Sequence, residues 1–498
     1  MMIQKALKTL PYILMAGLFL SIPVTNFPFF PSGFGGNAAG VRPLLVYPLF
    51  GLVLTVTIPR LISKPLPRPV IILALFFLWG LIVSIIPPLK GVESPWREVS
   101  LLPRELRTII TLGLGLFLYF TISLFPQAVT ELRFSLRWLY IGLGLVLTWG
   151  SLQAIYIIDL IPGWYGIMGK FQKMIAVQPL NTKRVSGMTF EPSSFADQLV
   201  VIWLPWVLAA SLDDFTVFKW RWKWITVERI LCIWIMVILA FTLSRTGLIV
   251  GLGVVSFAFI LKFIDPRMKD HRRKNGEKGQ SSWVQNHQKY RFLLIILGLG
   301  LFIGIFYFLG QRSNYISNMW EYSPFQEGFN LRKYFNNIGF GARIAYWETA
   351  WQTFKSYPFV GVGLGNYTFY FSEYLPYQKL SVIPELLRHI VPAANRTRVI
   401  TAKHFLTRIL AEMGIVGFGI FVVFLIVLAV MAVFLWASND SDERFWGTAG
   451  FIGLVAFLGA TFSFDSFAIP NPWILFGLIT AAFNVYYQKM KKRSHHAE

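Results

Sequence analysis

About twelve long apolar segments dominate the sequence, each close to the roughly 20 residues that an α-helix needs to cross the hydrocarbon core of a bilayer. Only 14% of the 498 residues are charged and 55% are hydrophobic, whereas about 25% of the residues of a typical soluble domain are charged. The composition therefore predicts an all-α polytopic membrane protein. The expected transmembrane helices cover residues 10–30, 41–59, 69–88, 108–125, 138–160, 195–211, 230–243, 246–264, 292–310, 405–436, 445–464 and 473–487.

Lysine and arginine residues indicate how these segments are oriented, because cytoplasmic loops hold an excess of them. With a cytoplasmic N-terminus, every strongly basic short loop falls on the same side, together with the C-terminus. The regions expected on the external side are 90–107, 162–191, the Ser244-Arg245 turn and 311–404. The net charge of +22 is then largely topological, so we expect membrane lipids and not nucleic acid as partners.

The external segment 311–404, between the ninth and tenth predicted spans, is the longest polar stretch. Loops beyond about 15 residues are usually functional or disordered, and this one is rich in aromatic residues, which a disordered linker lacks. Helical spacing of Ile344, Trp347, Trp351 and Phe354 predicts an amphipathic helix against the membrane or the bundle. We therefore expect a large, partly helical external loop with an excess of basic residues.

Two arginines beside apolar segments are the first candidates for a site. Arg245 lies between two predicted spans and Arg343 lies in the long loop. An arginine at the edge of the hydrocarbon is costly unless an anion or a carboxylate pairs with it. Arg245 could instead extend to the interface or pair with Asp159 or Glu191, and Arg343 could be a solvated loop charge.

Three motifs occur in an order that resembles the O-antigen ligase and O-antigen polymerase family. They are 242–247 (TLSRTG), 343–366 (RIAYWETAWQTFKSYPFVGVGLGN) and 410–417 (LAEMGIVG), and 190–193 (FEPS) resembles a further element of some exopolysaccharide polymerases. This resemblance divides the chain into N-terminal transmembrane helices (1–241), a ligase/polymerase-like region (242–436) and C-terminal helices with a basic tail (437–498).

The resemblance implies a metal-independent inverting glycosyltransferase of the bacterial inner membrane that needs no cofactor. Family members take a glycan from an undecaprenyl-diphosphate carrier at the periplasmic face. Polymerases transfer it to another lipid-linked glycan, ligases to the lipid A core of lipopolysaccharide, and related oligosaccharyltransferases to a protein. Arg245 and Arg343 correspond to the family's diphosphate-binding arginines. Fixed cations at these positions would stabilise the charge that grows on the leaving diphosphate.

The acceptor hydroxyl must also lose a proton, which requires a histidine or a carboxylate within hydrogen-bond reach. Ligases of the family commonly place a His-Asn pair before the Ala-Glu-x-Gly element. Here Lys403 occupies the histidine position and His404 the asparagine position. This difference favours a polymerase over a ligase, and we predict His404 and Glu191 as the catalytic candidates.

Each candidate also has a structural interpretation. His404 could simply start a helix, and Glu191 with Pro192 is typical of a helix N-terminus. The glycines at 361, 363 and 365 are expected to form a tight turn and not a phosphate cradle. Asp465 is expected to be a cap or turn residue. Secondary candidates for the site are His389, Arg388, Lys403 and Glu373.

The competing class of protein is a transporter of an anionic or lipid-linked solute. Such proteins usually contain internal repeats and charged residues at mid-membrane. We find no convincing repeat in this sequence, and its charges gather near the ends of the spans. The glycosyltransferase interpretation is therefore preferred.

Overall fold

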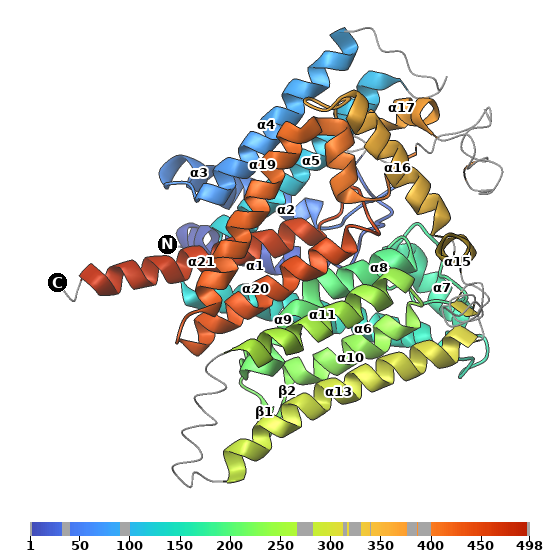
Figure 1. Cartoon of the computed structure of the whole chain (residues 1–498). Helices are drawn as coiled ribbons and strands as arrows, with labels where there is room; N and C mark the ends of the chain where they lie inside the picture. The colour runs from blue at the N-terminus through green and yellow to red at the C-terminus, as the bar shows by residue number, and fades with distance from the viewer. Residues whose placement is uncertain are drawn as a thin grey trace.

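The computed structural model describes residues 2–31, 40–89, 100–265, 282–311, 316–317, 330–338, 340–375, 386 and 400–495. These residues form helices almost throughout (Figure 1), which confirms the predicted all-α class. The elements before residue 220 are α1 (Met2–Ser21), α2 (Val46–Leu52), η3 (Val53–Thr57), α3 (Ile58–Ser63), α4 (Arg68–Leu89), α5 (Leu101–Leu124), α6 (Val129–Ile157), α7 (Trp164–Ile175), α8 (Pro192–Gln198), η4 (Leu199–Trp203) and α9 (Leu204–Asp213).

The second half of the chain begins with a short antiparallel hairpin in which Arg221 pairs with Thr226. Helices follow it as far as residue 495. The elements are β1 (Arg221–Trp222), β2 (Ile225–Thr226), α10 (Val227–Phe241), α11 (Arg245–Ile264), α13 (Ser282–Gln311), α15 (Leu331–Asn337), α16 (Gly341–Ser356), α17 (Tyr367–Tyr374), α19 (Phe405–Trp436), α20 (Ser441–Ala460) and α21 (Asn471–His495).

A helix lies at each of the twelve segments predicted to span the membrane. Within the described residues, seven helical segments are long and apolar enough to cross a bilayer. They are Val46–Ser63, Arg68–Leu89, Leu101–Leu124, Val129–Ile157, Pro192–Asp213, Arg245–Ile264 and Phe405–Trp436. A multi-pass membrane protein is therefore supported, while the count of twelve spans stays a prediction.

The first predicted span, 10–30, extends too far. Helix α1 ends at Ser21 because Pro23 follows closely, and the residue before a proline disfavours the α conformation. The chain then runs extended, and a parallel bridge joins Asn26 to Arg42. The Phe27 N–H donates to the Arg42 carbonyl at 2.9 Å.

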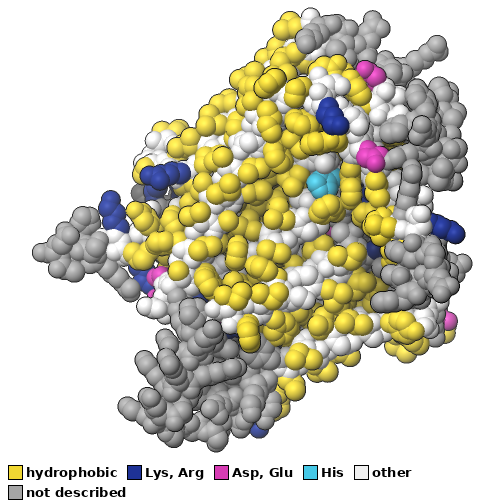
Figure 2. Space-filling model, viewed as in Figure 1, with side chains coloured by type: hydrophobic (Ala, Val, Ile, Leu, Met, Phe, Trp, Pro, Cys, Tyr) yellow, Lys and Arg dark blue, Asp and Glu magenta, His cyan; other side chains and the backbone are white. Residues whose placement is uncertain are grey.

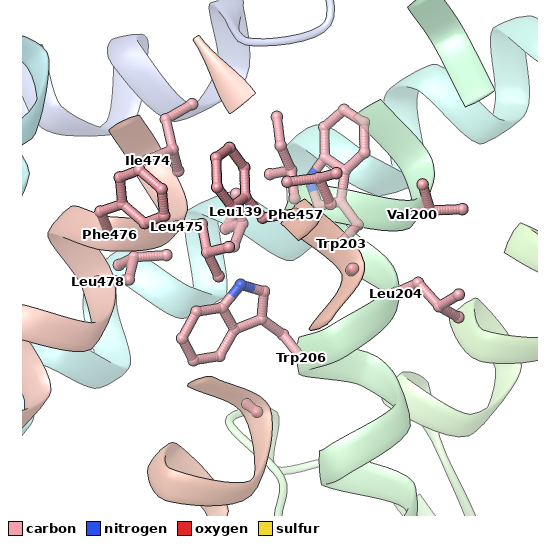
Figure 3. Close-up of a cluster of buried hydrophobic side chains, with 14 of the residues drawn as sticks. Leu139, Val200, Trp203, Leu204, Trp206, Phe457, Ile474, Leu475, Phe476 and Leu478 are labelled. Carbon is pink, nitrogen blue, oxygen red and sulfur yellow. The ribbon is translucent and has the colours of Figure 1, made fainter. Parts of the chain in front are cut away.

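The helical segment Pro192–Asp213 forms the centre of the bundle. All residues from 195 to 212 are buried, as expected of a helix that is apolar on every side. Trp203 and Trp206 pack among side chains of α6, α20 and α21 (Figure 3). Trp206 also meets Trp446 edge-on, with ring centroids 5.3 Å apart.

Ion pairs fix the C-terminal end of this central helix. Asp213 accepts a hydrogen bond from Lys262 Nζ at 2.7 Å, and Asp214 pairs with Arg229 Nη2 at 2.7 Å. Lys262 comes from the last turn of α11 and Arg229 from the first turn of α10. The two carboxylates therefore connect the end of α9 to both following helices.

The two ends of the bundle differ. Figure 1 shows both termini and the β1–β2 hairpin on one side, and α7, α15, α16 and α17 on the other. Hydrophobic side chains cover most of the visible surface between them (Figure 2). The shared side of the termini agrees with the charge-based topology, whose assignment of cytoplasmic and external faces stays a prediction.

Helix α16 buries a different face from the one predicted. The sequence favoured Ile344, Trp347, Trp351 and Phe354, yet Trp351 is 45% exposed. The buried face, toward α17 and α19, carries the large Tyr346 and otherwise small residues, Ala342, Ala345, Thr349, Ala350 and Thr353. Small side chains allow helices to approach closely, and the two threonine hydroxyls donate to carbonyls of the preceding turn.

Candidate functional site

Arg245 is the first residue of α11, directly after the tight turn that ends α10. Leu243 in that turn has a left-handed φ of 45°, and the Ser244 Oγ accepts a hydrogen bond from the Gly247 N–H at 3.1 Å. A Cβ on Gly247 would lie 2.7 Å from the Ala196 Cβ, so α11 begins in close contact with α8. The turn thus holds Arg245 beside α8, at a helix N-terminus that favours anions.

Arg343 lies in the first turn of α16 and reaches the turn that follows α20. Its Nη1 donates to the Phe462 carbonyl at 2.8 Å. The adjacent Ser463 Oγ donates to Asp197 Oδ2 at 2.6 Å, and Asp197 also interacts electrostatically with Arg343. Because Asp197 belongs to α8, the turn at Phe462 and Ser463 links Arg343 to the helix that the start of α11 also contacts.

His404 caps the N-terminus of α19. Its Nδ1 accepts the Thr407 N–H at 3.1 Å, and its ring packs edge-on against Phe462 and Trp347, at centroid distances of 4.6 and 5.3 Å. Burial lowers the pKa of His404 to about 4, against an opposing effect of Asp465. The ring is therefore neutral at pH 7, and with Nδ1 accepting, the proton sits on Nε2.

Phe462 joins these two predicted residues. Its carbonyl accepts from Arg343 and its ring packs on His404. The neutral ring offers an N–H donor at Nε2, whereas a general base needs an unprotonated nitrogen. The geometry therefore gives His404 the character of a hydrogen-bond donor next to Arg343.

The turn that follows α20 also borders a cavity of about 670 Å³, to which it contributes Ser463 and Asp465. Its volume falls within the range of small-molecule sites, roughly 300–1,000 Å³. Apolar residues such as Leu49 and Trp473 line part of it. We call it the basic cavity, because its charged lining consists of four cations, Arg104, Arg107, Lys403 and Arg408, and two carboxylates, Glu191 and Asp465.

Glu191 lies at the rim of the basic cavity, immediately before α8. Pro192 is the first helical residue, so the helix start predicted from the sequence is present. The exposed carboxylate accepts a hydrogen bond from the Ser193 Oγ at 2.7 Å. Glu191 also interacts electrostatically with Asp197, as Arg343 does. The carboxylate thus stands in the basic cavity and also acts on Asp197, the residue that Arg343 influences.

Of the secondary candidates, only Lys403 is found in the wall of the basic cavity among the residues that the structure describes. Lys403 is exposed and lines the basic cavity, and its backbone N–H donates to Asp465 Oδ2 at 2.7 Å. Glu373 is exposed on α17 and is not part of the cavity wall. Helix α19 begins after His404, so His404 and not Lys403 is the cap. His389 and Arg388 lie outside the described residues.

The glycine run between α16 and α17 forms a turn, as the sequence predicts. Gly361, Gly363 and Gly365 have φ values of 69°, 87° and 82°, which L-residues with side chains rarely adopt. A Cβ on Gly361 would lie 2.5 Å from the Glu412 backbone, and one on Gly365 would lie 2.4 Å from the Thr108 hydroxyl. The glycines therefore permit close contact with α19 and α5.

The turn docks onto an interruption within α19. Gly414 there has φ 65° and ψ −170°, which breaks the helix. The freed carbonyls of Ala411 and Glu412 accept the N–H groups of Val362 and Gly363 at 3.0 and 2.9 Å. Two of the motifs that carried the family resemblance are thus hydrogen-bonded to each other.

Four charged residues of the basic cavity were missed as site candidates. Arg408 pairs with Glu412 through Nε at 3.0 Å, and its Nη1 donates to the Asp465 carbonyl at 2.6 Å. Arg104 donates from Nε to the Gly365 carbonyl at 3.2 Å. The missed residues are Arg104, Arg107, Arg408 and Asp465.

The sequence contained a signal for three of these residues. Arg104 and Arg107 lie in the predicted external region 90–107, and Thr108 and Thr111 continue the same helix face at i+4 and i+7. Arg408 stands four residues before the glutamate of the third motif, the spacing of a helical ion pair. A helix face with arginines followed by hydroxyls is typical of a polar site wall.

The fold and these residues define a multi-pass helical membrane protein with a cationic site at one end of its bundle. Residues 230–422 match the family model described as O-Antigen ligase. The match contains the three motifs together with Arg245, Arg343 and His404, and it confirms the resemblance. This part of the chain is similar to the O-antigen ligase/polymerase family. No curated protein sequence matches the chain.

Proposed function

We propose that the protein is an inner-membrane glycosyltransferase that polymerises lipid-diphosphate-linked glycans at the external, periplasmic face, in O-antigen or exopolysaccharide synthesis. The observation that carries the proposal is the meeting of Arg343 and His404 at Phe462, beside the α8 helix that Arg245 also borders. Arg245, Arg343 and His404 come from three separate segments of the region that matches the O-antigen ligase model, 230–422.

The cationic groups would bind the diphosphate of the donor, an undecaprenyl-diphosphate-linked glycan. Breaking the glycosidic bond leaves the electron pair, and hence a growing negative charge, on the diphosphate oxygen. Arg343 and Arg245 stabilise this charge, and the Nε2–H of His404 donates a hydrogen bond to the same anion. Groups fixed before the reaction stabilise the transition state more than the ground state.

Glu191 is the favoured proton acceptor. A hydroxyl oxygen of the acceptor glycan attacks the anomeric carbon, the bond to the diphosphate oxygen breaks, and the hydroxyl proton passes to the carboxylate. This displacement inverts the configuration and needs no covalent intermediate. Glu191 suits the role because it is exposed in the basic cavity and lies within electrostatic reach of Asp197 next to Arg343.

A test of the proposal uses purified protein in liposomes with an undecaprenyl-diphosphate oligosaccharide, with and without a lipid A core acceptor. We expect a ladder of longer lipid-linked glycans without the core acceptor. A product formed only with the core acceptor would mean that the protein is a ligase and not a polymerase. Movement of unchanged oligosaccharide across the bilayer without any product would contradict the proposal in favour of a transporter.

The variant His404→Asn is predicted to keep the helix-capping role of residue 404 while it removes the hydrogen-bond donor. Asparagine is a strong N-cap residue, so the variant should keep its free energy of unfolding within about 0.5 kcal/mol, whereas His404→Ala should lose about 1 kcal/mol. Both variants lose the Nε2–H and should transfer glycan at least about tenfold more slowly, the usual worth of one charge-assisted hydrogen bond. Wild-type activity in His404→Asn would mean that the residue is only a cap.

The lowered pKa of His404 also predicts a pH dependence. The folded-state pKa of about 4 lies below the ordinary 6.5, so the neutral ring contributes stability fully above about pH 6.5. This contribution is lost as the pH falls toward 4. As the pH is lowered from 7 to 4.5, the unfolding temperature should therefore fall more steeply for the wild type than for His404→Asn.

A further inference from the structure

We infer that the basic cavity is a second binding site for a lipid-linked phosphate, which holds the acceptor while the donor occupies the Arg343 site. The inference rests on the proposed function. A polymerase that joins two lipid-linked glycans must hold two lipid phosphates at the same time, one as leaving group and one as retained anchor. The basic cavity has the charge, the size and the wall for the second one.

One face of α5 forms the length of the cavity wall. Its lining residues recur at helical intervals, and their chemistry changes along the helix from cationic through hydroxyl to aliphatic. At the rise of 1.5 Å per residue, this face is about 21 Å long. A phosphate joined to a hydrocarbon chain has the same gradient. Apart from Gly115, the lining residues of α5 in order are Arg104, Arg107, Thr108, Thr111, Leu114 and Leu118.

The cations at the polar end exceed the carboxylates that face them. Among the described residues, Arg408 forms an ion pair with Glu412, whereas the side chains of Arg104, Arg107 and Lys403 form no salt bridge with a carboxylate. Arg104 is repelled by Arg408 and Arg107 and attracted by Glu412 and Asp465, so two cations and two carboxylates act on it. Like charges gathered in this way are stabilised by an anion between them, and a guanidinium fork suits phosphate oxygens.

The apolar part of the cavity wall favours binding of a lipid-linked phosphate and not of a soluble phosphate. Leu45 and Leu49 of the 41–49 segment also line it, as does Trp473 of α21, which packs against α5 at Gly115. A free sugar phosphate would leave this surface uncovered, whereas a polyisoprenoid chain would bury it. Burial of this apolar area would favour binding of the lipid.

The turn after α20 separates the two proposed phosphate sites. The Phe462 carbonyl accepts from Arg343, while the following residues, Ser463 and Asp465, line the basic cavity. Glu191 lies at the rim of this cavity and interacts electrostatically with Asp197, which Ser463 contacts. An acceptor anchored in the cavity would thus bring its hydroxyl past the proposed base to the donor.

The test measures how many lipid diphosphates bind to one chain. Undecaprenyl diphosphate without sugar, which cannot be transferred, is titrated into purified protein in nanodiscs. We expect two bound molecules per wild-type chain and one for Arg107→Glu, with affinity at the lost site reduced at least about tenfold. Arg107 is exposed and no hydrogen bond of its side chain occurs among the described residues, so the variant should fold, and its thermal unfolding checks this.

Two controls separate the possible outcomes. Lys355→Ala removes an exposed cation from α16, away from the cavity wall, and should leave two bound molecules. Arg343→Ala should remove the donor molecule and leave the one in the cavity. If Arg343→Ala binds two and Arg107→Glu one, the proposed donor site fails while the cavity site stands.

The inference is overturned if the wild type binds a single molecule, or if Arg107→Glu still binds two. Inorganic diphosphate provides a further arm, because it shares the charge but lacks the chain. It should displace the lipid from the cavity at least about tenfold less effectively than undecaprenyl diphosphate does. Equal displacement would contradict a lipid-binding wall.

Discussion

Arg343→Ala is expected to abolish polymer formation while lipid-linked repeat units accumulate. The variant lacks the guanidinium that would stabilise the departing diphosphate. Loss of one group that stabilises charge in the transition state typically slows catalysis by roughly 10²–10³-fold. The measurement is the length distribution of the glycan made by purified protein, together with the amount of unreacted lipid-linked repeat unit.

Two further variants isolate the guanidinium as the cause. Arg343→Lys keeps the charge but loses the planar fork that binds two phosphate oxygens, so an intermediate rate is expected. Lys355→Ala removes a cation from the last turn of the same helix and should leave polymer length unchanged. Wild-type product from Arg343→Ala would rule out the proposed role.

Gly414→Ala is expected to have the largest effect on stability. Gly414 has φ 65° and ψ −170°, a region of backbone space that is essentially restricted to glycine and costs other residues about 1–3 kcal/mol. A Cβ there would also lie 2.2 Å from the Phe359 carbonyl oxygen. Since backbone atoms cannot move aside separately, the variant should lose at least about 3 kcal/mol.

Gly419→Ala is the matched control. Gly419 lies in the same helix, and nothing would come within 4 Å of an added Cβ. Alanine there should leave the protein unchanged or more stable by up to about 1 kcal/mol, because it favours the helix. Thermal unfolding in detergent compares the two variants. Equal unfolding temperatures would mean that the close contact between the glycine turn and α19 contributes little.

The helices and the motif positions could be predicted because they depend on local sequence. The apolar segments indicated the approximate helices, and the helix start at Pro192 followed from residue type. The buried face of α16 could not be predicted in this way. Burial on that helix depends on how closely α17 and α19 approach, and small residues such as Ala345 and Ala350 have no periodic apolar signal.

The basic cavity depends on tertiary packing and was therefore missed. Its charged residues come from α5, from the residue before α8, from the start of α19 and from the turn after α20. No sequence motif links Arg107 with Asp465, because about 360 residues separate them. The donor character of His404 was equally inaccessible, since it depends on the Thr407 N–H that the helix start presents to Nδ1.

The complete burial of the helix from α8 to α9 also has a mechanical consequence. Lipid-facing helices tilt or shift when bilayer thickness changes, but residues 195–212 are all covered by other protein segments. Glu191 and Asp197 stand at one end of this helix, while Asp213 is tied to α11 at the other. Protein packing alone thus sets the height of these carboxylates, which are insulated from deformation of the surrounding membrane.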